Sequence, residues 1–323
     1  MLKNRLTVSQ NVIYTPVLFL VFNRPDLSLR VFNRIRQVRP TSLYVAADAP
    51  RPDVEGETER CREVKKLISD VNWDCKVSYL FHEKHMGCKL AVCNAIDWFF
   101  NHEEYGIIIE DDCLPSRSFF LFCQELLEKY RNDERIMHIA GTNLHFGKTF
   151  GDGSYYFSRY NLIWGWATWK RAWQLYDKDM KTLPVLKRRY DLERILPSYK
   201  EFMLRMALYE EVYSEKIDTW DFQWHYATRI NSGLAIHPNE NLVQNIGFSK
   251  NATHTTNEKS KVAENAAKEI LFPLEHPEFI LVNRAADKDL FARYYSGGSL
   301  LYSLKELVPK QARDYVRYFF DRL

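Results

Sequence analysis

The sequence predicts an α/β fold with a mostly parallel central sheet flanked by helices. Through the first 130 residues, short apolar runs alternate with longer stretches whose apolar residues recur at helical spacing. Several of the short runs are apolar at every position, as in parallel strands that helices cover on both faces. The chain of 323 residues is long enough for one large domain of this kind or for two smaller ones.

The first strand and helix are expected within residues 16–38. Residues 16–22 are continuously apolar and are predicted to form a central strand. The sequence Asn-Arg-Pro-Asp at 23–26 interrupts this run, and Asp26 is expected to cap the following helix. The apolar residues of that helix are Leu27, Val31, Ile35 and Val38.

Three further strands and two helices are expected before residue 110. Residues 42–47 and 76–81 are predicted strands, with a charged amphipathic helix at 57–69 between them. A second helix is expected at 89–101, and the three isoleucines at 107–109 predict an interior strand. No Gly-x-Gly-x-x-Gly or Gly-x-x-x-x-Gly-Lys motif occurs, so a bound phosphate has to be held by a metal ion and basic side chains.

Three carboxylates, Glu110, Asp111 and Asp112, follow this last strand directly. Adjacent acids at the end of a buried strand repel one another unless a cation lies among them, and open α/β sheets bind ligands at the carboxyl ends of their strands. Mg²⁺ and Mn²⁺ prefer carboxylate oxygens and retain water ligands that phosphates can replace. We therefore predict a Mg²⁺ or Mn²⁺ site, with an acidic surface turn as the alternative. Pro115 and the apolar residues 119–122 predict that a helix comes next.

Aromatic residues and turns dominate the sequence beyond residue 140. Trp164, Trp166 and Trp169 fall within six residues. Flat rings stack on sugar rings, so this block predicts a sugar-binding wall, with an aromatic core cluster as the alternative. Trp220 and Asp221 again combine an aromatic ring with an acid. A carboxylate in a partly dry pocket suits a general base, whereas an isolated aspartate here would cap a helix.

The remaining segments predict a strand, a loop and a terminal helix. Residues 239–246 are expected to form a last strand or return segment, and residues 247–261 a polar, turn-rich loop that contains His254. Residues 309–323 place apolar side chains on one helical face and basic ones off it. This helix is predicted either to lie on an anionic membrane surface or to dock on its own domain.

Composition narrows the class of protein. A hydrophobic content of 46% indicates a sizeable core, and a net charge of +3 gives no reason to expect nucleic acid as a partner. No stretch approaches 18 consecutive apolar residues, and the first ten residues are polar, unlike a signal peptide. The six cysteines form no Cys-x-x-Cys pair. We expect a cytoplasmic protein with reduced thiols.

These motifs, in this order, resemble those of nucleotide-sugar glycosyltransferases with the GT-A fold. The resemblance is to the N-acetylglucosaminyltransferase I type and to bacterial sugar transferases described as haemolytic-protein-like, and it covers roughly residues 16–255. It implies that Arg24, in Val-Phe-Asn-Arg-Pro, contacts the nucleotide. It also implies that Asp48 contacts the uracil and that His85, in His-Met-Gly-Cys-Lys-Leu, binds the nucleotide.

The Glu-Asp-Asp motif resembles the acidic motif of that family. The resemblance implies that Glu110 touches the donor sugar, Asp111 contacts the ribose and Asp112 coordinates the metal. The loop that begins at Gly247 resembles the family's donor-closing loop. His254 is accordingly expected to be a further metal or diphosphate ligand.

The tryptophan-rich half resembles the acceptor side of the same enzymes. The Trp-Asp pair resembles a pair whose aspartate is the catalytic base, which assigns that role to Asp221. Trp164, Trp166 and Trp220 are expected to form the acceptor or sugar wall.

The implied organisation is a polar leader (1–15), a catalytic domain (16–255) and a helical C-terminal extension (256–323), the catalytic domain dividing into nucleotide-binding and acceptor halves between residues 115 and 116.

The implied activity is metal-dependent, inverting transfer of a sugar from a nucleotide-diphosphate donor, a UDP-sugar, to a hydroxyl of a glycan or lipid-linked acceptor. The C-terminal helix would bring such an enzyme to the inner membrane face. A sugar nucleotidyltransferase is an alternative, although such enzymes usually carry a glycine-rich basic loop where Asn23-Arg24-Pro25 stands. A carbohydrate-binding module without catalysis is the other alternative.

Overall fold

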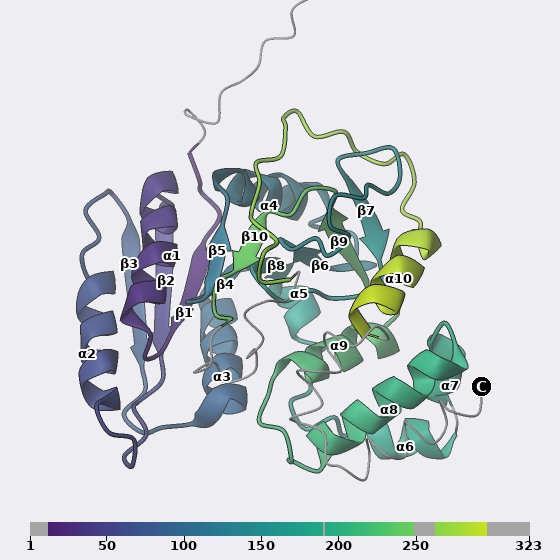
Figure 1. The fold of residues 1–323 in the computed structure, drawn as a ribbon, viewed down its shortest axis with the longest axis horizontal. Helices are drawn as coiled ribbons and strands as arrows, with labels where there is room; N and C mark the ends of the chain where they lie inside the picture. Colours follow the sequence, from purple (N-terminus) through teal and green to yellow (C-terminus); the bar gives the residue numbers. More distant parts are fainter. Residues whose placement is uncertain (1–11, 190, 249–261, 296–323) are drawn as a thin grey trace, which may run out of the picture.

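The computed structural model describes residues 12–189, 191–248 and 262–295 and contains an eight-stranded sheet at its centre (Figure 1). The strand order is β3-β2-β1-β4-β8-β6-β9-β7. The strands are β1 (Val17–Val21), β2 (Ser42–Ala47), β3 (Lys76–Phe81), β4 (Tyr105–Glu110), β6 (Ile136–Ala140), β7 (Tyr155–Ser158), β8 (Trp166–Trp169) and β9 (Leu234–Pro238). The first four strands of the chain pair in parallel, as do β6 and β9. The predicted α/β fold with a mostly parallel sheet is confirmed.

Three antiparallel contacts interrupt this arrangement. Strand β8 runs antiparallel to both of its neighbours, β4 and β6, and β7 runs antiparallel to β9 at the sheet edge. A separate antiparallel pair joins β5 (Cys113–Pro115) to β10 (Val243–Asn245). This pair brings the segment after β9 back beside the acidic turn at the end of β4.

Helices cover both faces of the sheet because the pleat sends alternate side chains of its strands in opposite directions. Val17, Phe19 and Val21 of β1 face α1 (Pro25–Val38), α2 (Glu57–Ile68) and α4 (Arg117–Lys129). Leu18 and Leu20 face α3 (Gly87–His102) and α9 (Asp221–Ile230). Strands β1, β2 and β4 are therefore buried on both sides, as their continuous apolar runs predicted, whereas the edge strand β3 is partly exposed.

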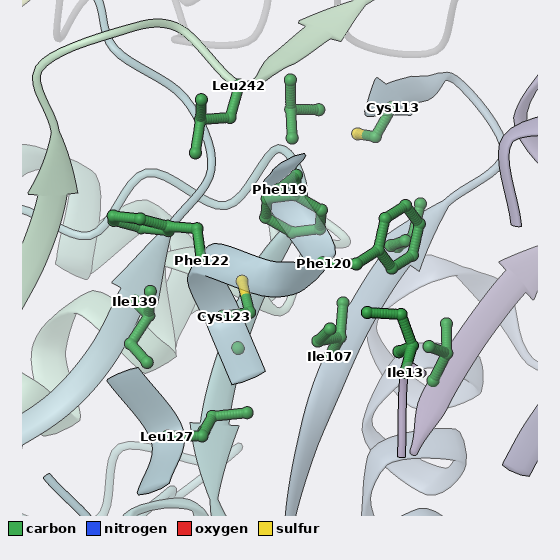
Figure 2. Packing of buried hydrophobic residues seen from close by; sticks show 14 of the residues in the cluster. Ile13, Ile107, Cys113, Phe119, Phe120, Phe122, Cys123, Leu127, Ile139 and Leu242 are labelled. Carbon is green, nitrogen blue, oxygen red and sulfur yellow. The ribbon is translucent and has the colours of Figure 1, made fainter. Parts of the chain in front are cut away.

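Helix α4 supplies much of the core on the first face. Figure 2 shows Phe119, Phe120 and Phe122 of this helix among side chains from the sheet, including Ile107 of β4 and Ile139 of β6. All three phenylalanines are fully buried. The apolar run that predicted a helix after the acidic motif is therefore the part of α4 that anchors it to the sheet.

Several helices from the second half of the chain gather at one end of the molecule. Helices α6 (Leu183–Arg188), α7 (Asp191–Ile195) and α8 (Tyr199–Tyr213) lie with α9 at the lower right of Figure 1, and α5 (Lys170–Trp173) follows β8. Residues 262–283 are irregular, and helical structure returns only at α10 (Arg284–Leu290) and the π-helical turn Phe291–Tyr295. The predicted terminal helix at 309–323 lies outside the described residues.

Several local predictions need correction or completion. Asp26 does not cap α1, because the helix begins at Pro25 and Asp26 lies within its first turn. The tryptophan block contains a strand, β8, and β6, β7 and β9 were also not anticipated. Within the predicted strand or return segment at 239–246, only β10 (Val243–Asn245) is a strand. All six cysteines are free thiols. In the described part of the chain, no helix has the length and apolarity that crossing a bilayer requires.

Candidate functional site

A cleft of about 1070 Å³ lies where β1, β2 and β4 end. Its walls come from the loops after these strands, from the start of α3, from residues 161–164 and from the facing surfaces of α8 and α9. The position agrees with the rule that open α/β sheets bind ligands beyond the carboxyl ends of their strands.

The acidic motif forms one wall of this cleft. Glu110 is the last residue of β4, and Asp111 and Asp112 form the turn that follows. Arg24, which immediately precedes α1, lies against this turn, with its Nη2 2.8 Å from Asp111 Oδ1 and its Nη1 2.9 Å from Asp112 Oδ2. Asp111 is buried and also accepts a hydrogen bond of 3.4 Å from the Phe22 amide. Arg24 therefore joins the end of β1 to the end of β4.

One arginine does not balance three carboxylates. Burial raises the pKa of Glu110 to about 8, and the charges of Asp112 and Asp111 add to this rise while Arg24 opposes it. Burial likewise raises the pKa of Asp111 to about 6, against the lowering effect of Arg24. Burial alone would lower the pKa of Arg24, but the charges of Asp111 and Asp112 dominate and hold it above its ordinary value. The site carries more negative charge than its surroundings stabilise.

This donor set fits a cation whose remaining ligands come from a substrate and water. No group of three or more histidine, cysteine, aspartate or glutamate side chains is arranged as a metal cage among the described residues. Mg²⁺ needs only one or two carboxylates when phosphates and water complete its shell. Glu110 Oε1 is buried without a hydrogen-bond partner, and Asp112 keeps part of its side chain exposed. Of the predicted metal ligands, Asp112 lies at this wall and His254 lies outside the described residues.

Gly247, which follows β10, lies directly beside the Asp112 carboxylate. A Cβ atom at position 247 would lie 2.2 Å from Asp112 Oδ2. The Ile246 amide donates a 2.7 Å hydrogen bond to the Asp112 carbonyl, which extends the pairing of β5 with β10. The absence of a side chain at 247 is therefore what allows this backbone to pass beside Asp112.

Asp48 and His85 lie together beside the acidic wall. The Asp48 carboxylate accepts hydrogen bonds from the amides of Ala49, Met86 and Gly87 at 2.8 to 3.1 Å. His85 Nδ1 lies 2.9 Å from Asp48 Oδ2. Both residues line the cleft. In this structure Asp48 holds the start of α3 against the end of β2, so its oxygens are largely occupied by the chain itself.

Two arginines that the sequence reasoning did not single out, Arg51 and Arg60, also line this end of the cleft. Arg51 pairs with the buried carboxylate of Glu57, which also accepts a 2.7 Å hydrogen bond from Asn23. Hydrogen bonding from Arg51 lowers the pKa of Glu57 to about 2. The arginine-proline sequence after the second strand was the available signal, but a surface turn has the same composition.

Asp221 lies on the facing wall, at the first position of α9. The Thr219 hydroxyl donates a hydrogen bond to Asp221 Oδ1. The charge of Asp221 is among the influences that raise the pKa of Glu110. The predicted base and the acidic motif therefore face the same cleft across a distance at which their charges interact.

The three predicted wall tryptophans have different environments. Trp164 and Trp220 line the cleft, although Trp220 is almost fully buried. Trp166 is fully buried, does not line the cleft, and stacks on Trp220 with ring centroids 5.5 Å apart. For Trp166 the core alternative therefore holds. Its place in β8, paired with Ile108 of β4, leaves no face for a sugar.

Asp218 is a further cleft residue that the sequence reasoning did not assign. Its carboxylate accepts hydrogen bonds from the amides of Cys88 at 2.8 Å and Lys89 at 3.0 Å. It thus caps the first turn of α3 from the segment that leads into α9, and ties the two walls of the cleft together.

No protein-family model and no curated protein matches the chain. Three solved structures with a similar chain path are HddC from Yersinia pseudotuberculosis, a UDP-glucose pyrophosphorylase complexed with UDP-glucose, and 4-diphosphocytidyl-2C-methyl-D-erythritol synthase from Anaerococcus prevotii, each 11% identical to this chain. They cover 49%, 69% and 53% of this chain and 77%, 89% and 77% of their own, with TM-scores of 0.30, 0.34 and 0.29. Likeness at this level decides nothing about the activity of this protein.

Proposed function

We propose that the protein is a metal-dependent, inverting glycosyltransferase that uses a nucleotide-diphosphate sugar, with UDP as the nucleotide. The observation that carries this proposal is the pair of facing walls. An acidic motif with more negative charge than it can stabilise lies at the carboxyl end of β4, and the carboxylate of Asp221 lies across the cleft from it.

The acidic wall would hold the donor. Asp112, with Glu110 beside it, would hold Mg²⁺ or Mn²⁺, which supplies positive charge to the leaving diphosphate. Arg24 is placed to bind the nucleotide phosphates if the cation takes over its two carboxylate partners. His85 and Arg51 line the part of the cleft beyond it, where the nucleoside would lie.

Asp221 would act as the base. The Thr219 hydroxyl engages Oδ1 and orients the carboxylate, which leaves Oδ2 to take the proton of the acceptor hydroxyl. The acceptor oxygen then bonds to the anomeric carbon as the bond from that carbon to the diphosphate oxygen breaks. A single displacement with one base on the face opposite the leaving group inverts the anomeric configuration. Trp164 offers a partly exposed ring beside this position.

Nucleotidyl transfer is the second candidate. Arg51 and Arg60 give the cleft positive charge that a nucleoside triphosphate would need. Against it, α1 begins at Pro25, directly after Arg24, so no glycine-rich loop stands between β1 and this helix. The two reactions release different products, since nucleotidyl transfer to a sugar phosphate liberates pyrophosphate.

The test is a panel of UDP-, GDP- and dTDP-sugars with and without Mn²⁺, run for the wild type, Asp112→Ala and Asp221→Asn. Metal-dependent release of one nucleotide diphosphate that is lost in both variants supports glycosyl transfer. We expect Asp221→Asn to lower turnover by 10²- to 10⁴-fold, the usual contribution of a general base, while the donor with Mn²⁺ still raises its melting temperature. Pyrophosphate release from UTP and a sugar 1-phosphate would favour the second candidate. If no nucleotide sugar shifts the melting temperature of the wild type, both enzymatic candidates are contradicted and a non-catalytic carbohydrate-binding module remains.

A further inference from the structure

One part of the cleft, lined by α8, α9 and the segment around residue 161, has buried polar side chains that the proposed chemistry does not use. Arg205 of α8, His225 of α9 and Asn161 all line the cleft and are 1%, 4% and 8% exposed. Burying polar groups at a cleft wall costs free energy unless a partner satisfies them. A ligand with the right chemistry would be such a partner.

Two buried nitrogen atoms in this part of the cleft, one on Asn161 and one on His225, have no hydrogen-bond partner among the described residues. The Thr228 hydroxyl donates to Asn161 Oδ1 at 3.0 Å, and Asn161 Nδ2 is buried without a partner. His225 Nδ1 lies 2.7 Å from the Tyr209 hydroxyl, and its Nε2 is likewise buried without a partner. In the tautomer in which the Tyr209 hydroxyl donates to Nδ1, the proton of the neutral ring is on Nε2, and Nε2 acts as a donor in that tautomer.

Positive charge accompanies these donors. Arg205 and Arg229 share one buried carboxylate, Glu201, at 3.9 Å and 3.3 Å. Burial, with the charges of Arg205 and Arg229, holds the pKa of His225 well below its ordinary value, so the ring is neutral. Asp287 faces Arg229 from α10, but its oxygens accept hydrogen bonds from Ser158 and the Arg159 amide.

The proposed base lies on the same face of α9. Asp221, His225 and Arg229 follow at intervals of four residues, which places successive side chains one above another, about 6 Å apart. One monosaccharide is large enough to present a hydroxyl to Asp221 and a second substituent to His225. Helix α8 lies beside α9 (Figure 1), and the charge of Arg205 on α8 acts on His225 of α9.

We infer that this end of the cleft is a subsite for an oxyanion, a carboxylate or phosphate carried by the acceptor, held by Arg205, Asn161 and His225. The planar guanidinium suits either group, and the two neutral donors add hydrogen bonds without adding charge. The acceptor would then be an acidic or phosphorylated sugar. Calling the ligand an acceptor rests on the proposed function, whereas binding of the oxyanion does not.

The experiment measures dissociation constants of the full chain for glucose, glucuronate and glucose 6-phosphate by NMR titration, without nucleotide or metal. We expect at least one anionic sugar to bind about tenfold more tightly than glucose, the effect of ~1.4 kcal/mol and within the range of a hydrogen bond to a charged group. A preference for glucuronate identifies a carboxylate ligand, and a preference for glucose 6-phosphate identifies a phosphate. If neither binds more tightly than glucose, the inference is overturned.

Two variants locate the effect. Asn161→Asp keeps Oδ1 for Thr228 but puts a negative charge at the subsite, and should abolish the preference. Asn132→Asp makes the same change at an exposed position outside the cleft and should preserve it. If Asn161→Asp does not fold, His225→Phe, which removes Nε2 but keeps a ring, should weaken the preference several-fold.

The acidic end of the cleft provides a further control. Arg24→Met removes the guanidinium there and should leave the preference intact. A preference lost in Arg24→Met and kept in Asn161→Asp would mean that the anion binds beside the acidic motif, and the inference would fall. Nucleotide-sugar turnover without an anion preference would overturn this inference alone. The preference, with neither turnover nor a melting shift on any nucleotide sugar, would overturn the proposed function and leave the subsite.

Discussion

Replacing Glu110 by glutamine should stabilise the protein at alkaline pH and have little effect near pH 5. The pKa of Glu110 is about 8 in the folded chain against an ordinary value of 4.5. Between these values the folded state binds a proton that the unfolded state has released, so stability is fully present below about pH 4.5 and falls as the pH rises toward 8. Glutamine carries no charge to bury and removes this loss.

The size of the effect follows from the same values. Each pH unit between 4.5 and about 8 corresponds to about 1.4 kcal/mol, which sets an upper limit of about 5 kcal/mol. Glu110 lines an open cleft and is only partly buried as a residue, so solvent screens its charge. We therefore expect Glu110→Gln to raise the free energy of unfolding by about 2 to 4 kcal/mol at pH 8 and above. For a chain of this length that difference raises the melting temperature by roughly 3 to 6 °C.

The assay is thermal unfolding of the wild type and Glu110→Gln from pH 5 to 9 with EDTA present, and Glu134→Gln, at an exposed position, is the matched control. The melting temperature of Glu110→Gln should exceed that of the wild type by an amount that increases with pH. The melting temperature of Glu134→Gln should show no such increase relative to the wild type. If Glu110→Gln destabilises the protein equally at every pH, the reasoning is refuted. Such a result would mean that the carboxylate stabilises the fold and that its charge costs no free energy there.

Three other changes test the cleft and the core. Gly247→Ala would place a methyl group against Asp112, so the melting shift produced by UDP with Mn²⁺ should be reduced or lost, while secondary structure by circular dichroism is retained. Arg24→Met leaves Asp111 and Asp112 without their counter-ion and should lower the free energy of unfolding at pH 8 by about 3 kcal/mol. Mn²⁺ alone should then stabilise the variant more than it stabilises the wild type. Equal stabilisation of the two proteins by Mn²⁺ would contradict the proposed cation site. Trp166→Leu should cost about 2 to 4 kcal/mol in urea unfolding, as expected for a fully buried ring, and a near-neutral effect would argue against its core position.

The first half of the fold was predictable because its strands and helices follow local rules. The strands at 42–47 and 76–81 form at the predicted residues, and the apolar run at 16–22 contains β1. The position of the acidic motif also followed from the sequence, since a β-branched run directly before it indicated a strand and the sheet rule then placed its end at a binding edge. These inferences needed only hydrophobic pattern and chain order.

The second half depended on tertiary contacts that the sequence does not encode locally. Trp166 and Trp164 are two residues apart and chemically identical, yet one lies inside β8 and the other lines the cleft. A tertiary contact also decides the environment of one residue of the first half, Asp48: it was expected to contact the uracil, but two amides from the start of α3 donate to its carboxylate. Strand β8 pairs with β4 and β6, which are distant from it in sequence, so no short sequence pattern predicts these partners.

The same β8 strand has a dynamic consequence. It lies hydrogen-bonded between β4, which ends at Glu110, and β6, and its Trp166 stacks on Trp220, the residue before Asp221. Trp224, one turn further along α9, donates a 3.2 Å hydrogen bond to His138 of β6. Opening the cleft by a hinge between its two walls would therefore require breaking a β-ladder and an aromatic stack at once. We therefore expect the carboxylates on the two walls to keep their relative positions when ligand enters or leaves.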